Sequence, residues 1–328
     1  MRRRWLLLAV ILTVPSGCDN VTWGGVDVRL QAPPPQAEVA PASVMEEEHE
    51  VPLPPLPDGP ILLAGTREGD GATLSVVGEV RGDALAPLPT EDEVPGFRAH
   101  FTQALLAPGT QLVLFSEGVR IGRMTVTENS EDTRFCHPRP QVTGVVELVP
   151  GASGARRIMA LTDTASVRRP FGEFRTWNHD YDQRVASLAL ATEAIPQVGA
   201  AWPPSLLETR ADIQAFRLPD ARGASVAATF VFNDRLAVSA PGEGAYALFV
   251  MGTAEGSAYR SSYLGYRPAG AEGKGVPRYF GHLDWDGDGD SEILLDVFGA
   301  EHRWFASLGQ RNGTWTQTYQ DACGAPAG

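Results

Sequence analysis

The stretch Pro108–Val126, PGTQLVLFSEGVRIGRMTV, contains two β-rich runs joined by a short polar turn. The runs, Gln111 to Phe115 and Val119 to Thr127, are rich in β-branched and other apolar residues that favour extended backbone. Glu117 and Gly118 stand between them, and a two-residue connection that contains glycine is typical of a β-hairpin. The stretch therefore predicts two adjacent antiparallel strands.

Similar short runs surround this hairpin in the first half of the chain. Glycine, proline or charged residues separate them, and a segment compatible with a short helix, Phe97 to Leu106, interrupts them. Short strands at regular spacing predict a small antiparallel barrel or sandwich, which we place at residues 61–165. The remaining runs are Ile61 to Ala64, Thr73 to Val77, Val142 to Val149 and Arg157 to Leu161.

The second half of the chain carries longer β-rich runs. We expect a second β-rich domain with a β-meander at residues 206–328, and a hinge with a short helix, Gln183 to Ala194, at residues 166–205. Asn312-Gly313 is a strong hairpin signal because both residues accept positive φ. The fold class predicted is mainly β. The runs are Ala224 to Val231, Ala245 to Met251, Ser257 to Tyr266, Ile293 to Phe298, His302 to Leu308 and Thr314 to Tyr319.

A dense group of acidic residues precedes one of these strands. From Asp284 to Gly299 the sequence reads DWDGDGDSEILLDVFG, with acids at alternate positions, namely Asp284, Asp286, Asp288, Asp290 and Glu292. Such crowded carboxylates repel one another unless a cation lies among them. Oxygen-only ligands suit a hard ion, and Ca²⁺, which accepts about six to eight oxygens in flexible geometry, fits better than Mg²⁺. The alternative is a solvated acidic turn between strands.

The residues after the acids distinguish two kinds of calcium loop. An EF-hand requires an acid at position 12, and that position is Leu295, within an apolar run. The pattern D-x-D-G-D-G-x-x-E followed by Ile-Leu-Leu resembles the FG-GAP or VCBS-type calcium loop of integrin-α-like proteins. That resemblance implies side-chain ligands from Asp284, Asp286, Asp288 and Glu292 and mainly a backbone carbonyl from Asp290. Because the pattern occurs once, we do not expect a full propeller, which needs repeated blades.

The N-terminal sequence MRRRWLLLAVILTVPSGC has the layout of a secretory signal, with arginines, an apolar run and small residues. The apolar run is shorter than the about twenty residues that a membrane-spanning helix needs. Ser16-Gly17-Cys18 resembles the end of a bacterial lipobox, although Pro15 departs from the usual pattern. The resemblance implies a signal peptide at residues 1–17 and a lipid on Cys18. Ordinary signal-peptidase cleavage is the alternative.

Residues 18–60 are rich in proline and alanine and contain an acidic cluster. Such a segment cannot bury enough apolar surface to offset chain entropy, so we interpret it as a disordered tether. A lipid on Cys18 and this tether predict a protein anchored to the bacterial cell envelope, at its periplasmic face or at the cell surface.

Two cysteines remain after Cys18. In an oxidising compartment Cys136 and Cys323 are expected to form a disulfide, the alternative being two free thiols. In the chain-entropy view this long loop would contribute roughly 4 to 5 kcal/mol to stability.

The formal net charge of the 328 residues is −13, and loss of the three leader arginines would bring it near −16. Such a surface repels nucleic acid and anionic lipid headgroups, so we expect neither as a partner. Another envelope protein or an extracellular polymer remains the expected partner.

The sequence contains no G-x-S-x-G, P-loop, H-E-x-x-H or C-x-x-C motif. We therefore assign no catalytic residue and favour a calcium-stabilised binding or structural module. The alternative is a secreted hydrolase with a purely structural Ca²⁺. Its chemistry would involve His179, Asp180 and Asp182, although such a segment is more often a surface loop held by its aromatic residues.

Overall fold

The computed structural model describes residues 52–162, 172–219, 221, 223–256, 258–270 and 273–324. The expected signal peptide, Cys18 and the greater part of the expected tether lie outside the described residues. No helix among the described residues combines the length and apolar character that crossing a bilayer requires.

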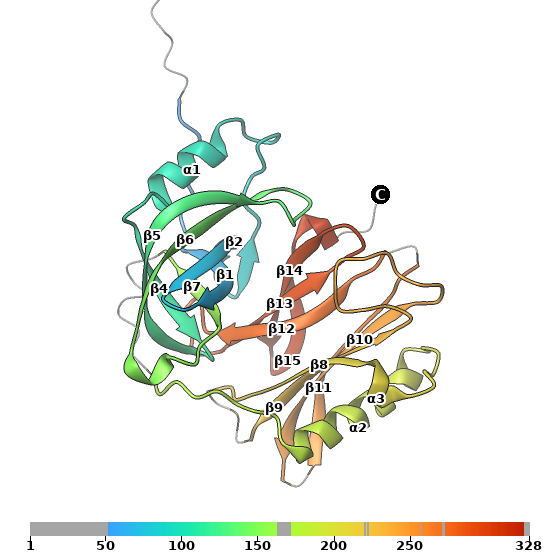
Figure 1. The fold of residues 1–328 in the computed structure, drawn as a ribbon. Coiled ribbons are helices and arrows are strands. Elements are labelled where there is room, and N and C mark those ends of the chain that lie inside the picture. The colour runs from blue at the N-terminus through green and yellow to red at the C-terminus, as the bar shows by residue number, and fades with distance from the viewer. Residues whose placement is uncertain are drawn as a thin grey trace, which may run out of the picture. The chain divides into compact units, whose positions relative to one another are not determined.

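Six strands of the described chain close into an antiparallel barrel (Figure 1). Their order is β1-β7-β4-β5-β6-β2, and β2 pairs again with β1 to complete the ring. A short strand, β3 (Ala84–Ala86), extends the sheet beside β2. The barrel strands are β1 (Ile61–Glu68), β2 (Gly71–Arg81), β4 (Gln111–Ser116), β5 (Val119–Asp132), β6 (Arg139–Leu148) and β7 (Arg157–Leu161).

The predicted hairpin at Glu117 and Gly118 connects β4 to β5. Both residues have positive φ, 52° and 74°, as a tight two-residue connection between twisted strands requires. Asn312 and Gly313, with φ of 53° and 74°, make the same kind of turn later in the chain.

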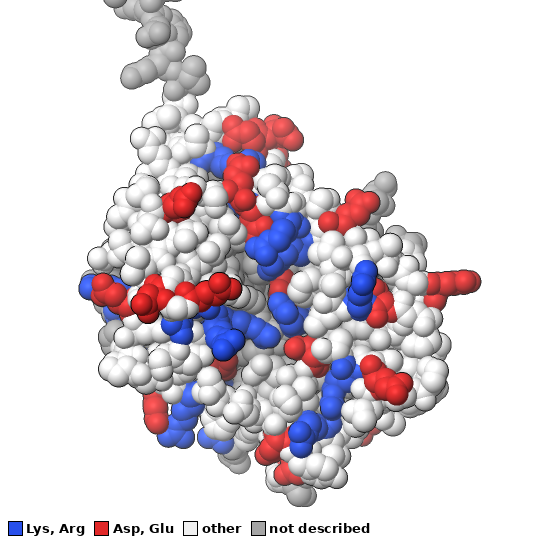
Figure 2. Space-filling model, viewed as in Figure 1, with Lys and Arg blue, Asp and Glu red and all other residues white. Residues whose placement is uncertain are grey.

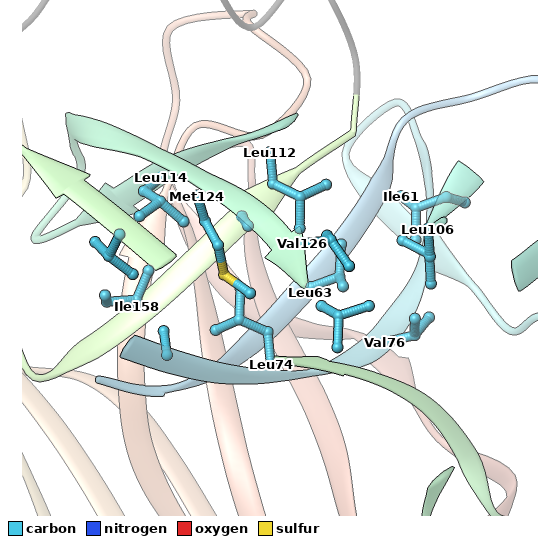
Figure 3. Packing of buried hydrophobic residues seen from close by; sticks show 14 of the residues in the cluster. Ile61, Leu63, Leu74, Val76, Leu106, Leu112, Leu114, Met124, Val126 and Ile158 are labelled. Atoms are coloured by element: carbon cyan, nitrogen blue, oxygen red, sulfur yellow. The ribbon is translucent and has the colours of Figure 1, made fainter. Parts of the chain in front are cut away.

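The barrel interior is filled by aliphatic side chains from alternate strand positions (Figure 3). In β1, Ile61 and Leu63 point inward, while Leu62 and Ala64 point outward and are also buried. A strand that is apolar on both faces must therefore lie between two layers. The helix α1 (Phe97–Leu105) adds Phe97 and Phe101 to the inner cluster.

The second half of the chain forms two four-stranded antiparallel meanders within the described residues. One has the order β11-β10-β9-β8 and the other β12-β13-β14-β15. Together with the barrel they confirm the predicted mainly β fold, which is not a propeller. The strands are β8 (Arg210–Phe216), β9 (Ser225–Phe232), β10 (Tyr246–Glu255), β11 (Ala258–Pro268), β12 (Val276–Leu283), β13 (Glu292–Phe298), β14 (Arg303–Arg311) and β15 (Thr314–Gln320).

The β12–β15 sheet lies between the barrel and the β8–β11 sheet. Leu294 and Phe305 pack against outward side chains of the barrel, and Ile293 packs toward the other meander. The helix α2 (Tyr181–Gln197) covers the remaining face of β8–β11, and α3 (Leu206–Thr209) follows it. From Pro52 onward, the described residues form one compact unit.

Two further contacts join distant parts of this unit. Cys136 and Cys323 lie at disulfide distance, with Cα atoms 5.5 Å apart, so the pairing expected from the cysteine count is geometrically satisfied. Residues 52–60, which we assigned to the tether, also contact the barrel: Leu56 packs against its core, and the Gly59 N–H donates to Glu79 Oε1 at 2.8 Å.

Candidate metal centre

The acidic loop connects β12 to β13, which pair directly at its base through Leu283 and Glu292. Trp285 stands between the first two aspartates, yet only 1% of it is exposed, because it packs into the apolar layer between the barrel and the β12–β15 sheet. Gly287 and Gly289 have φ of 86° and 103°, a region that glycine enters without steric cost. One buried tryptophan and two glycines thus fix the loop against the body of the protein.

Backbone N–H groups of the loop donate to its own aspartates. Asp284 accepts from Gly287 at 2.6 Å and from Gly289 at 3.2 Å, one on each carboxylate oxygen. Asp286 Oδ1 accepts from the Asp288 N–H at 3.2 Å. Each carboxylate oxygen has a second lone pair, so these bonds orient the acids without exhausting their capacity to bind a cation.

Three of the five predicted ligands come together. Asp284, Asp286 and Glu292 each offer a carboxylate oxygen, and these atoms all lie within 4.8 Å of one another. Asp288 and Asp290 are exposed and lie outside this group, and Asp288 Oδ1 accepts the N–H of Asp290 at 2.8 Å. The grouping spans the loop and joins its start to the first residue of β13.

The electrostatics of the group favour a cation. Glu292 is 2% exposed, and its burial, together with the charges of Asp286, Asp284 and Asp288, raises its pKa to about 9, although the Trp285 N–H acts in the opposite direction. Burial likewise raises the pKa of Asp286. A divalent ion would remove the repulsion and stabilise all three carboxylates in their charged form.

The donor set fits a hard divalent cation. Asp284, Asp286 and Glu292 would hold it through oxygen atoms, and the remaining positions of a Ca²⁺ shell are open to backbone oxygens and water. An ion bound there would neutralise the carboxylates of the loop, which Trp285 holds against the barrel. The expected effect is structural: the ion would keep the loop ordered and stabilise the contact between the two layers.

His282 precedes the loop but has another role. Its Nδ1 lies 2.6 Å from the Tyr279 hydroxyl, and burial lowers the pKa of His282 to about 4, with a hydrogen bond to the Arg217 backbone acting in the opposite direction. The imidazole is thus a neutral, hydrogen-bonded core group. It packs beside the β4–β5 turn, where the Gly118 N–H donates to the His282 carbonyl at 3.1 Å.

The residues of the hydrolase alternative lie at the start of α2. Asp180 is the N-cap, and its Oδ1 accepts from the Asp182 and Gln183 N–H groups at 2.9 and 3.2 Å. Gln183 Oε1 accepts from the Asp180 N–H in return, which completes a capping box. His179, Asp180 and Asp182 are exposed. Helix capping explains this acidic spacing without invoking catalysis.

Comparison of the chain with protein-family models, with curated proteins and with solved structures finds no match. The candidate site therefore rests on its own geometry and chemistry.

Sequence reasoning missed a second charged site, built around Lys274. The side chain of this lysine, the only one in the chain, is 0% exposed. Four oxygens lie within hydrogen-bond distance of its Nζ, which has three N–H donors: Asp234 Oδ1 at 2.7 Å, the carbonyls of Arg235 and Ala237 at 3.0 and 2.8 Å, and Ser239 Oγ at 3.0 Å. The only signal was that a single lysine stood in an arginine-rich chain, which does not by itself indicate burial.

Proposed function

We propose that this chain is a cell-envelope lipoprotein whose β-rich body acts as a calcium-stabilised binding or structural module. One observation carries the proposal: buried Glu292 meets Asp284 and Asp286 within 4.8 Å, on a loop fixed at the barrel by Trp285. The repulsion among these acids is the kind that a bound divalent ion relieves.

The expected benefit is stability of the native state. An ion that binds the folded chain and not the unfolded one adds RT ln(1 + [L]/Kd), about 2.7 kcal/mol at a hundredfold excess over Kd. The loop lies where the barrel meets the β12–β15 sheet, so the ion would make the whole unit more rigid rather than order one exposed turn. A rigid body suits a module that presents a fixed surface to a partner.

The envelope assignment comes from the sequence. Lipid on Cys18 would attach the chain to a membrane, and residues 18–60 would separate the body from it, apart from the part that contacts the barrel. The expected partner is another envelope protein or an extracellular polymer, and nucleic acid is not expected.

Thermal melting tests the metal proposal. We expect the midpoint in millimolar Ca²⁺ to exceed the midpoint in EGTA, and Asp286→Ala to abolish the difference. Asp92→Asn, which changes an exposed acid far from the loop in sequence, is the matched control and should respond to Ca²⁺ as the wild type does. An unchanged midpoint for the wild type would remove calcium from the account.

Membrane fractionation tests the anchor separately. Cys18→Ser should move the full-length protein from the membrane fraction to the soluble fraction, and intact mass should lose the lipid. Retention of the variant in the membrane fraction would show that another element anchors the chain.

A further inference from the structure

Three arginines from different parts of the chain meet beside the β12–β15 sheet. Arg278 lies on β12, Arg303 lies on β14, and Arg134 belongs to the connection between β5 and β6. The backbone carbonyl of Arg134 accepts the Arg303 N–H at 3.0 Å. Figure 2 shows basic side chains gathered near the middle of the face it draws, in the region where Figure 1 places β12 and β14. This concentration of positive charge stands out in a chain of net charge −13.

Aspartates lie beside these arginines. Asp296, 1% exposed, lies between Arg278 and Arg303, with Oδ2 2.7 Å from Arg278 Nη2 and Oδ1 2.9 Å from Arg303 Nη2. Arg134 donates from Nε to Asp132 Oδ1 at 2.7 Å and from Nη2 to Asp132 Oδ2 at 2.6 Å. Arg278 also acts electrostatically on the carboxylate of Asp212, so three carboxylates accompany the three guanidinium groups.

Two strong donors of the cluster are unused. The Nε atoms of Arg278 and Arg303 are buried and have no hydrogen-bond partner within the described residues. Their side chains keep 28% and 16% exposure, so each side chain still reaches the surface. Buried donors without acceptors are unfavourable, and proteins rarely retain them without a reason such as an absent ligand.

The electrostatics point the same way. Burial lowers the pKa of Arg303, and the positive charges of Arg134 and Arg278 act in the same direction, against Asp296 and Asp132. Burial and the neighbouring arginines thus act against the positive charge of Arg303. An added negative charge would stabilise it.

Aromatic rings hold the guanidinium planes in place. Arg278 lies over the Phe298 ring at 5.0 Å, and Arg303 lies over the Phe135 ring at 5.1 Å. Stacked guanidinium groups lose less freedom when they form further hydrogen bonds, and their planar fork matches the oxygens of a carboxylate or a phosphate.

We propose that Arg134, Arg278 and Arg303 form a binding site for an oxyanion, the carboxylate or phosphate group of a ligand. The inference deepens the proposed function, since it rests on the body being a binding module and names the chemistry of what it binds. The acidic surface elsewhere repels densely charged polyanions, so the site suits a ligand that carries few negative groups.

Calorimetric titration tests the site, with inorganic phosphate and glucuronate as probes in separate experiments at constant ionic strength. We expect saturable binding of at least one probe, and which one binds identifies the oxyanion as phosphate or carboxylate. Arg278→Gln should weaken that binding roughly tenfold or more, because it removes a charge-assisted donor. Arg278→Lys keeps the charge, loses the fork and should give an intermediate affinity.

The matched control is Arg123→Gln, which removes an equal charge from an exposed pair with Glu147 on the barrel and should leave the affinity unchanged. If Arg278→Gln does not fold, Arg278→Lys carries the test. Absence of saturable binding for both probes, or an equal loss in Arg123→Gln, would overturn the proposal. Titrations in EGTA distinguish failure of the anion site from failure of the calcium proposal. If the anion still binds in EGTA and Ca²⁺ does not raise the melting midpoint, only the calcium proposal is rejected.

Discussion

Two loops of this protein each bring several oxygen atoms close together. The negative charge of their carboxylates is compensated in different ways. The loop at residues 234–239 directs a carboxylate, two carbonyls and a hydroxyl at the ammonium of Lys274. The loop at residues 284–292 gathers three carboxylates, and no lysine or arginine lies in its sequence. The first carries its cation in the chain, whereas for the second we propose a cation from solution. The same requirement, compensation of negative charge, is met at one site by a lysine of the chain itself and at the other by a proposed ion.

The largest effect is expected where the internal cation is removed. Lys274→Met should cost about 3 to 5 kcal/mol of unfolding free energy, because it leaves Asp234, 3% exposed, without its partner. Urea denaturation measures the loss. The double variant Lys274→Met, Asp234→Asn should recover part of it, since the unpaired charge is then gone. A single variant as stable as the wild type would show that the lysine merely fills space.

The acidic loop should respond in the opposite way. Glu292→Gln removes a negative charge from the group, so we expect stability in EGTA to be equal or higher and the calcium-induced gain, about 2.7 kcal/mol at a hundredfold excess, to disappear. Melting curves of both proteins, with and without Ca²⁺, provide the measurement. Lys274→Met supplies the control, because it should keep its calcium response. A calcium gain that survives in Glu292→Gln would place the ion elsewhere.

Asp132 extends the comparison to a carboxylate compensated by arginine. Burial tends to raise its pKa, but hydrogen bonds from Arg134 and Ser75 prevail and lower the pKa to about 2. A depressed pKa stabilises the fold above the unfolded value near 3.8, and this contribution, about 2 kcal/mol, is lost as pH falls from about 4 to 2. Denaturation across that range should show the decline, and Asp132→Asn should flatten it. An equal decline in the variant would assign it to other acids.

Glu117 should give an effect of the opposite sign. Burial raises the pKa of Glu117 to about 7, with Arg157 only partly opposing it, and its Oε2 has no hydrogen-bond partner within the described residues. The fold therefore favours the protonated form, so stability is full below pH 4.5 and declines as pH rises toward 7. Glu117→Gln should gain about 3 kcal/mol at pH 8 and remove this decline. Denaturation of both proteins at pH 5 and pH 8 measures the effect, and equal pH dependence would contradict it.

Much of the fold followed from local pattern, and the exceptions have local causes. The predicted runs in residues 61–165 correspond to strands of the barrel, and both predicted hairpin turns form because Gly118 and Gly313 permit the required φ. Strands β8 and β12 were not predicted. Their sequences, RADIQAF and VPRYFGHL, carry charged residues, proline or glycine that weaken strand patterns, and they become strands because neighbouring strands pair with them.

The candidate site was predictable in part. Alternating acids identified the loop, but the grouping of Asp284, Asp286 and Glu292 without Asp288 and Asp290 depends on how the glycines turn the backbone. Trp285 escaped notice because a tryptophan between aspartates looks exposed until the barrel covers it. The ion itself stays a prediction.

What this chain encodes locally is its strand class, its tight turns, its acidic loop and the cysteines able to pair, because each depends on residues close together in sequence. Folding alone brought Asp296 between Arg278 and Arg303, closed four oxygens around Lys274 and set the acidic loop against the barrel. These arrangements join residues far apart in the chain. Their charges interact strongly only when burial removes the water that would otherwise screen them.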